Sequence, residues 1–138
     1  QKKQLFLECD ELDVGLATKK FLLNHAVYVL TPIFEENAAY IKENIKSIRF
    51  KDTKSRWGSC SSEGSLMVSW RLIMAPPSVY RYVIIHEIAH LRYMNHGDEF
   101  WTLVKKLHPF YLNDRFWLKK NGKTLKSFVF DAAKEDTA

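Results

Sequence analysis

The sequence predicts an α+β fold, with a long N-terminal helix, a small antiparallel sheet packed on a central apolar helix, and two shorter helices at the end. Three observations indicate it. Apolar residues near the start of the chain recur every three to four positions, as on one face of a helix. The segment 46–51 then alternates apolar and charged residues, which is typical of a strand. Residues 79–94 form a nearly unbroken apolar segment of helical length.

The N-terminal helix is predicted from its apolar stripe. The stripe consists of Leu16, Leu23, Val27, Leu30, Phe34, Ala38, Ile41 and Ile45. This spacing places the side chains on one helix face, which can pack against a core. Pro32 lies within the stripe and cannot donate a backbone hydrogen bond, so we expect it to kink the helix.

The sheet is predicted from three short segments. The first is 46–51, with its period of two. Two further segments, 55–60 and 65–70, flank the polar residues 61–64, which include a glycine suited to a turn. We therefore expect these two segments to pair as a hairpin in a small antiparallel sheet.

Helix boundaries in the second half follow from prolines and capping residues. Pro76, Pro77 and Ser78 indicate the start of the central helix, because proline is tolerated in the first turn and serine can cap it. Asp98 can cap a further helix over 99–107, which Pro109 ends. We expect a last short helix over residues 110–120.

The length of 138 residues fits one compact domain, which we expect to cover residues 1–130. The polar segment 131–138 is predicted to be a flexible tail. Because the chain starts at Gln1 and shows no signal-peptide pattern, we expect it to be the C-terminal part of a longer protein.

Composition limits the possible environments and partners. Two cysteines, Cys9 and Cys60, are too few for a disulfide framework, so we expect the protein to lie in a reducing cytoplasm. No apolar run in the sequence is long enough to cross a membrane. The net charge of +5 permits anionic partners, including nucleic acid. The lysines are scattered in pairs, which favours solvated helix faces over a nucleic-acid interface.

The chemistry is indicated by His86-Glu87-Ile88-Ala89-His90, the H-E-x-x-H pattern, within the central helix. Four residues are about one helical turn, so both imidazoles can bind one Zn²⁺ ion. Glu87 follows the first histidine and is placed to act as a general base toward a water that such an ion polarises. The alternative is two hydrogen-bonded core histidines, but burying two histidines and a glutamate without partners would be costly.

Catalytic zinc usually takes a third protein ligand, and His96 is the best candidate. The helix must end before it, and Asn95 can adopt the left-handed conformation that turns the chain back, with further freedom from Gly97. Asp98 and Glu99 are rival ligands, although they can instead cap the next helix and favour its N-terminal dipole.

Four motifs carry a resemblance to a known family. They are SRWGSC at 55–60, WRLIMAP at 70–76, YVIIHEIAHL at 82–91 and NHGDEFW at 95–101. Over about residues 45–118 the sequence resembles the YgjP-like family of metal-dependent hydrolases, which is related to the WLM and SprT-like zinc peptidases. The resemblance implies a minimal zincin fold, with His86, His90 and His96 as zinc ligands and Glu87 as catalytic acid/base. Ser69 stands where that family is expected to have asparagine.

Several other residues could belong to the site or to the core. Arg56 could bind an oxyanion or a substrate carboxylate, or it could form a structural ion pair. Core packing is the preferred interpretation of Trp57, Trp70, Phe100, Trp101 and Trp117. Candidate donors to a developing oxyanion are Tyr93, His108 and Tyr111. Cys60 is expected to be a small buried hydrophobe.

The leading hypothesis is a zinc-dependent peptidase whose substrate lies along the strand near residues 65–70. A metal-dependent nucleotide pyrophosphatase is the enzymatic alternative, but the sequence has no glycine-rich phosphate loop and no carboxylate cluster suited to Mg²⁺. The third possibility is a DNA- or protein-binding module with structural zinc.

Overall fold

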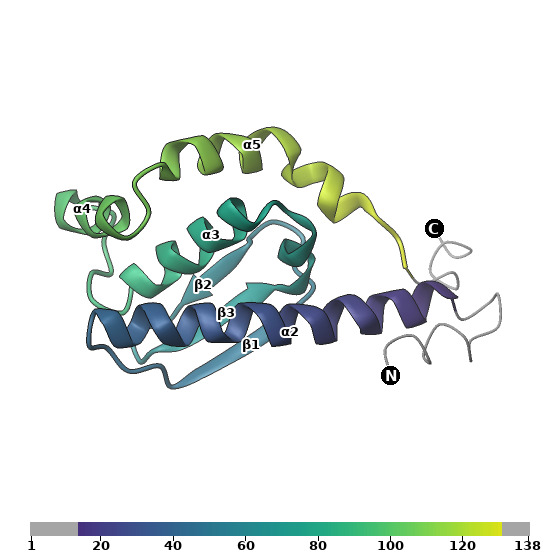
Figure 1. Cartoon of the computed structure of the whole chain (residues 1–138), viewed down its shortest axis with the longest axis horizontal. Helices are drawn as coiled ribbons and strands as arrows, with labels where there is room; N and C mark the ends of the chain where they lie inside the picture. Colours follow the sequence, from purple (N-terminus) through teal and green to yellow (C-terminus); the bar gives the residue numbers. More distant parts are fainter. Residues whose placement is uncertain (1–13, 131–138) are drawn as a thin grey trace.

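The computed structural model describes residues 14–130, and the predicted tail at 131–138 and Cys9 lie outside that range. The elements are α2 (Val14–Tyr40), β1 (Ser47–Lys51), β2 (Gly58–Cys60), β3 (Ser65–Ser69), the 3₁₀ helix η2 (Trp70–Met74), α3 (Pro77–Ala89), α4 (Asp98–Leu107) and α5 (Tyr111–Ser127). Helix α3 lies between α2 and α5, and the small sheet lies beside it (Figure 1). The predicted α+β architecture is confirmed.

Pro32, where a kink was expected, lies inside α2, which continues past it as one helix (Figure 1). The helix ends at Tyr40, before the last residues of the apolar stripe. Lys42 has a φ of 60°, and this left-handed residue turns the chain toward β1. The stripe still serves the core, because Leu30 and Phe34 are fully buried.

The sheet has the order β1-β3-β2 and is mixed. The predicted hairpin is confirmed, since β2 pairs with β3 antiparallel, and Gly64 in its turn has a φ of +92°. The first strand differs from the prediction, because β1 pairs with β3 parallel, Ser47 lying opposite Ser65. Strand β3 therefore has partners on both sides, and β2 forms an edge of the sheet.

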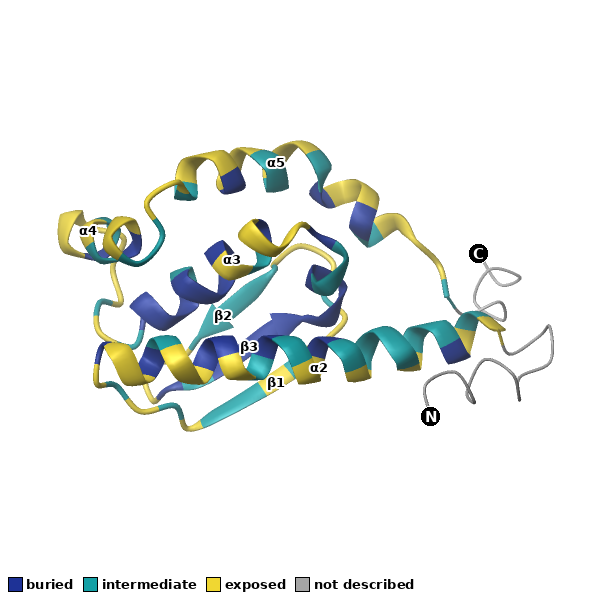
Figure 2. Ribbon diagram, in the orientation of Figure 1, coloured by how far each residue is buried: buried dark blue, intermediate teal, exposed yellow. Residues whose placement is uncertain are grey.

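The core lies between α2, α3, α4, the 3₁₀ helix η2 and the sheet. Fully buried side chains there include Leu66, Val68, Leu72, Val79, Ile84, Ile88, Phe100 and Val104. Figure 2 shows α3 mainly buried, whereas much of α5 is exposed. Among the described residues, no helix combines the length and apolar character needed to cross a membrane.

Helix α5 is longer than predicted, because it continues through Gly122 to Ser127. Gly122 is buried, and a Cβ at this position would lie 3.2 Å from Nε1 of Trp57. The glycine therefore allows close packing of α5 on Trp57 instead of ending the helix.

Two cations fix the connection between β1 and β2 to the end of α5. The buried Arg71 guanidinium donates to both carboxylate oxygens of Asp52, at 2.7 and 3.2 Å, and to the carbonyl oxygens of Leu125 and Phe128. This pairing lowers the pKa of Asp52. Lys126 Nζ donates to the carbonyl oxygens of Thr53, at 2.7 Å, and Arg56, at 3.0 Å. The segment 52–57 is thereby held in place.

Ser69 is fully buried, and its Oγ accepts a hydrogen bond from the backbone N–H of Arg71. It caps η2, a short helix that the sequence analysis did not predict. The side chain at this position is therefore used within the fold.

Candidate metal centre

Helix α3 presents His86 and Glu87 from its last turn, and His90 follows as its C-cap residue. The helix ends at Ala89, earlier than the predicted residue 94. The N–H of Leu91 donates to the carbonyl of Ile88, three residues back, so a tighter turn replaces the α-helix here. The early end frees the chain to fold His96 back toward α3.

The His90 ring is oriented by the backbone. Its Nδ1 lies 3.0 Å from the carbonyl oxygen of Tyr93. Because a carbonyl oxygen can only accept, Nδ1 carries the hydrogen and the lone pair is on Nε2. A histidine held in this way offers Nε2 as a ligand, as in many metal sites.

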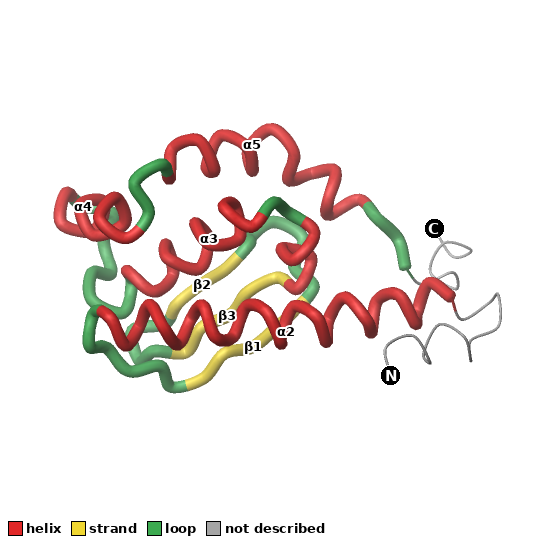
Figure 3. Tube along the Cα trace, viewed as in Figure 1, coloured by secondary structure: helices red, strands yellow, loops and turns green. Residues whose placement is uncertain are grey.

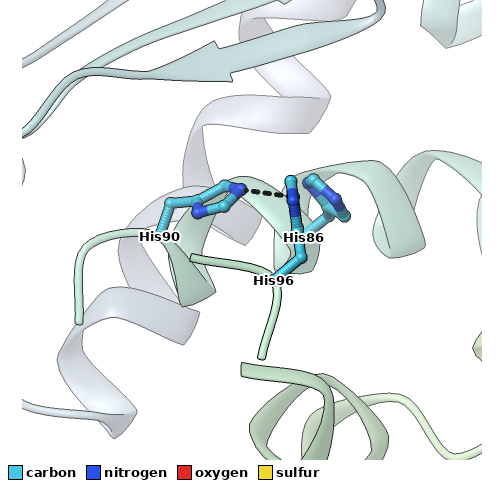
Figure 4. A group of neighbouring side chains, drawn as sticks. All are labelled: His86, His90 and His96. Atoms are coloured by element: carbon cyan, nitrogen blue, oxygen red, sulfur yellow. Dashed lines mark hydrogen bonds between the residues drawn. The ribbon is translucent and has the colours of Figure 1, made fainter. Parts of the chain in front are cut away.

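His96 reaches the pair from the loop between α3 and α4, which Figure 3 draws as a non-helical connection. Its Nε2 lies 3.0 Å from Nε2 of His90, and the three rings of His86, His90 and His96 face a common point (Figure 4). One ring nitrogen from each histidine lies within 4.8 Å of the other two. Three ring nitrogens gathered in this way could hold a metal ion.

The turn toward His96 does not use the predicted conformations. Among residues 14–130, a positive φ occurs only at Lys42 and Gly64, so Asn95 is not left-handed. Gly97 has a φ of −87° and forms the N-cap of α4 in place of Asp98. The chain turns through the tight end of α3 instead.

Phe100 forms the floor of the centre. It is fully buried, and its ring centroid lies 5.1, 4.5 and 4.9 Å from those of His86, His90 and His96. Trp101 lies beside His96, with stacked rings 5.9 Å apart. Partial burial, followed by the charges of the two neighbouring imidazoles, lowers the pKa of His96, which favours the neutral form that binds metals.

Glu87 is 5% exposed and lies beside the histidines. Its Oε2 is 3.1 Å from Nδ1 of His86. On the other side, the backbone of Gly58 in β2 is so close that a Cβ there would lie 2.9 Å from Cγ of Glu87. The carboxylate is therefore held between α3 and the edge strand.

A cavity of about 200 Å³ adjoins this carboxylate. It is lined by Arg56, Trp57, Gly58, Tyr82, Val83, His86, Glu87 and Leu118. The predicted Arg56 side chain thus lies at the same cavity as His86 and Glu87. The rival ligands Asp98 and Glu99 are exposed, and neither belongs to the group of possible metal ligands that the described residues form.

The candidate oxyanion donors are placed differently from one another. His108 Nε2 interacts with the buried carboxylate of Asp114, to which Ser78 Oγ also donates at 2.7 Å, so His108 has a structural partner. Tyr111 stacks on Trp101, with ring centroids 5.3 Å apart, and is thus in the aromatic wall beside the histidines.

The aromatic residues predicted to pack in the core do so to different extents. Trp70 and Phe100 are buried, while Trp101 and Trp117 pack partly buried against the core. Trp57 is half-buried and also lines the cavity. Cys60 is free and half-buried.

Two residues of the centre were missed by sequence reasoning as parts of the site. Gly58 supports Glu87, and Phe100 supports all three histidines. Both occur within the motifs SRWGSC and NHGDEFW, so the motifs contained a signal, but a glycine and a phenylalanine carry no chemical function that would single them out.

Comparison with known protein families identifies the family of the chain. A sequence model described as "YgjP-like, metallopeptidase domain" matches residues 9–121. The chain belongs to the YgjP-like metallopeptidase family. Among curated proteins, none matches the chain.

The crystal structure of the metallopeptidase zymogen abylysin from Pyrococcus abyssi is similar to this YgjP-like chain. The TM-score is 0.51 at 21% sequence identity, and the alignment covers 73% of this chain and 92% of the abylysin chain. At this level of identity the similarity shows a shared fold. Membership of a metallopeptidase family implies a metal cofactor, and the histidine triad could hold one.

Proposed function

We propose that this YgjP-like domain is a zinc-dependent peptidase in which His86, His90 and His96 bind the metal and Glu87 transfers the proton. The observation that carries the proposal is the convergence of the three imidazoles beside a buried carboxylate that is not itself one of the grouped ligands. Nitrogen donors from three histidines suit zinc, and such a set leaves one coordination position open.

When bound, zinc supplies Lewis acidity that polarises a substrate carbonyl and lowers the pKa of water. The protein residues supply the rest. Glu87 lies at the cavity, where its carboxylate can accept a proton from water and return it to the leaving amine. The contact with His86 and the close backbone of Gly58 restrict the motion of this carboxylate, which keeps the proton acceptor in position.

The peptide is expected to lie along β2 rather than along residues 65–70. The sequence favoured residues 65–70, but β3 is the central strand and its backbone pairs with both neighbours, which leaves it no free edge for a peptide. Strand β2 pairs with β3 on one side, and in the described part of the chain no strand pairs with its other side. An extended peptide can add to such an edge through main-chain hydrogen bonds. Gly58, at the start of β2, lines the cavity with Glu87.

The test combines metal analysis with digestion of a peptide library. Wild type should bind one zinc per chain and cleave peptides, and a chelator should abolish cleavage. Glu87→Ala should keep the zinc but lose at least about a hundredfold in kcat, because general acid–base catalysis contributes about 10²–10⁴-fold. Glu99→Gln serves as a control, because this exposed carboxylate is outside the histidine group. Retained cleavage in Glu87→Ala would refute the mechanism.

A further inference from the structure

A second cavity, of about 450 Å³, continues the candidate active site along α5. It is lined by Lys54, Ser55, Trp57, Leu118, Lys119, Gly122, Lys123, Lys126 and Ser127, and is called the lysine pocket below. Trp57 and Leu118 line both cavities, so the two adjoin. A substrate extending from Glu87 past Trp57 would enter the lysine pocket.

Positively charged side chains outnumber negatively charged ones in the linings of the two cavities. Lys119, Lys123 and Lys126 recur at intervals of three to four residues on one face of α5, and Lys54 belongs to the opposite wall. Across both linings the one acidic side chain is Glu87. Within residues 14–130, no carboxylate forms an ion pair with Lys54, Lys119 or Lys123. These three ammonium groups can therefore bind an anionic ligand.

Lys126 differs from the other three lysines because its ammonium group is already used within the fold. Its Nζ is bonded to backbone oxygens of the segment 52–57 and lies 4.2 Å from the centre of the Trp57 ring. One face of that ring is therefore covered by a cation and cannot stack on a nucleobase. The exposed lysines carry flexible ammonium groups, whereas phosphate sites commonly use glycine-rich backbone amides. Because the lining of the lysine pocket has no arginine and no glycine-rich loop, we take carboxylate side chains rather than a nucleotide as its ligand.

We propose that the lysine pocket is a substrate subsite that selects aspartate or glutamate side chains on one side of the scissile bond. This proposal rests on the peptidase function proposed above and adds a substrate class to it. Lys54, Lys119 and Lys123 attract the carboxylates, and Trp57 forms the wall between the subsite and Glu87. The preference for acidic peptides weakens as salt rises, because these lysines are exposed.

The experiment measures peptide binding separately from cleavage. Zinc-loaded Glu87→Gln is titrated with a fluorescein-labelled decapeptide containing three glutamates, and with the same peptide containing glutamines. Fluorescence anisotropy should give about fivefold tighter binding of the glutamate peptide at low salt, given the usual strength of exposed ion pairs. Adding Lys119→Gln and Lys123→Gln should reduce this preference to less than about twofold.

Lys120→Gln is the matched control, because Lys120 is an exposed lysine of the same helix that does not line the pocket. It should keep the preference, whereas equal binding of both peptides to the parent protein would overturn the proposal. A preference that survives in the double lysine variant would also overturn it, because the carboxylates would then be recognised elsewhere, for example at the zinc. The proposal would also be overturned if ATP displaced the labelled peptide at a lower concentration than the unlabelled glutamate peptide does, because this would indicate a phosphate site.

Wild-type enzyme is then incubated with the same two peptides. Cleavage that favours the glutamate peptide supports both proposals. If the glutamate peptide binds preferentially but neither peptide is cleaved, the subsite stands as an acidic-peptide site and the peptidase function is refuted. Equal cleavage of both peptides has the opposite meaning, because the function then stands and the subsite does not.

Discussion

The substitution Gly58→Ala tests whether the edge strand positions Glu87. The added Cβ would lie 2.9 Å from Cγ and 3.1 Å from Oε2 of Glu87, and 3.1 Å from the carbonyl oxygen of Met67. These distances are too short for unstrained contact, so either the carboxylate or the strand must move. Since Gly58 does not have a positive φ, alanine can adopt its backbone conformation, and the effect comes from the contact alone.

The size of the effect on kcat and on stability depends on whether Glu87 or the strand moves to relieve the strain. The Met67 oxygen belongs to the paired strand and resists displacement, while the Glu87 side chain can rotate away. A misplacement of about 1 Å can reduce the rate about a hundredfold. Overpacking of this kind costs about 1–3 kcal/mol of stability. We expect kcat to fall toward that of Glu87→Ala, and zinc affinity to stay near that of wild type.

The assay compares kcat on a cleaved peptide, zinc affinity by chelator competition, and unfolding in urea. Gly97→Ala is the control, because a Cβ at Gly97 meets no atom within 4 Å. That variant should lose at most about 1 kcal/mol through the helix cap and keep its kcat. If Gly58→Ala has wild-type kcat, or if it loses zinc while Gly97→Ala does not, the proposed role of the strand is incorrect.

Three further predictions concern the ligands, the thiol and the acid range. His96→Ala should abolish stoichiometric zinc binding in metal analysis, whereas Glu99→Gln should retain one zinc per chain. Burial, with a contribution from nearby Glu87, raises the pKa of Cys60 to about 11, so in the metal-free protein iodoacetamide should label it far more slowly at pH 8 than a model thiol, as peptide mapping can measure. The pKa of Asp52 lies below its usual 3.8, so its interaction with Arg71 stabilises the fold above that pH and is lost as the pH falls through the lowered pKa. Asp52→Asn should therefore lower the free energy of unfolding by about 1 kcal/mol at pH 7, and urea titrations should show this difference shrinking as the pH falls below the usual range of an aspartate; a constant difference would contradict this origin.

The histidine centre was predictable because it is local in sequence. His86 and His90 are one helical turn apart, and His96 follows after a short loop, so spacing alone restricts where their side chains can meet. The orientation of the His90 ring was not predictable. The carbonyl of Tyr93 orients His90 because the helix ends early, and no residue type marks that event in the sequence.

Features that depend on distant segments were predicted poorly. Period-two alternation identified β1 as a strand but could not specify its partner, and the parallel pairing with β3 emerged only in the fold. The last helix was predicted to end at residue 120, two residues before Gly122. Its packing on Trp57, which is far away in sequence, determines its actual place within α5.

The bonds from Arg71 and Lys126 have a consequence for how the domain assembles. The three histidines lie within ten residues of one another along the chain, whereas Lys126 is 73 residues from Thr53, whose carbonyl it binds. Contacts between distant residues require closure of a long loop and form late in folding. We therefore expect a partly folded chain to gather its imidazoles before the segment 52–57 is secured, so that the proposed metal site would form before the cavity beside it is complete.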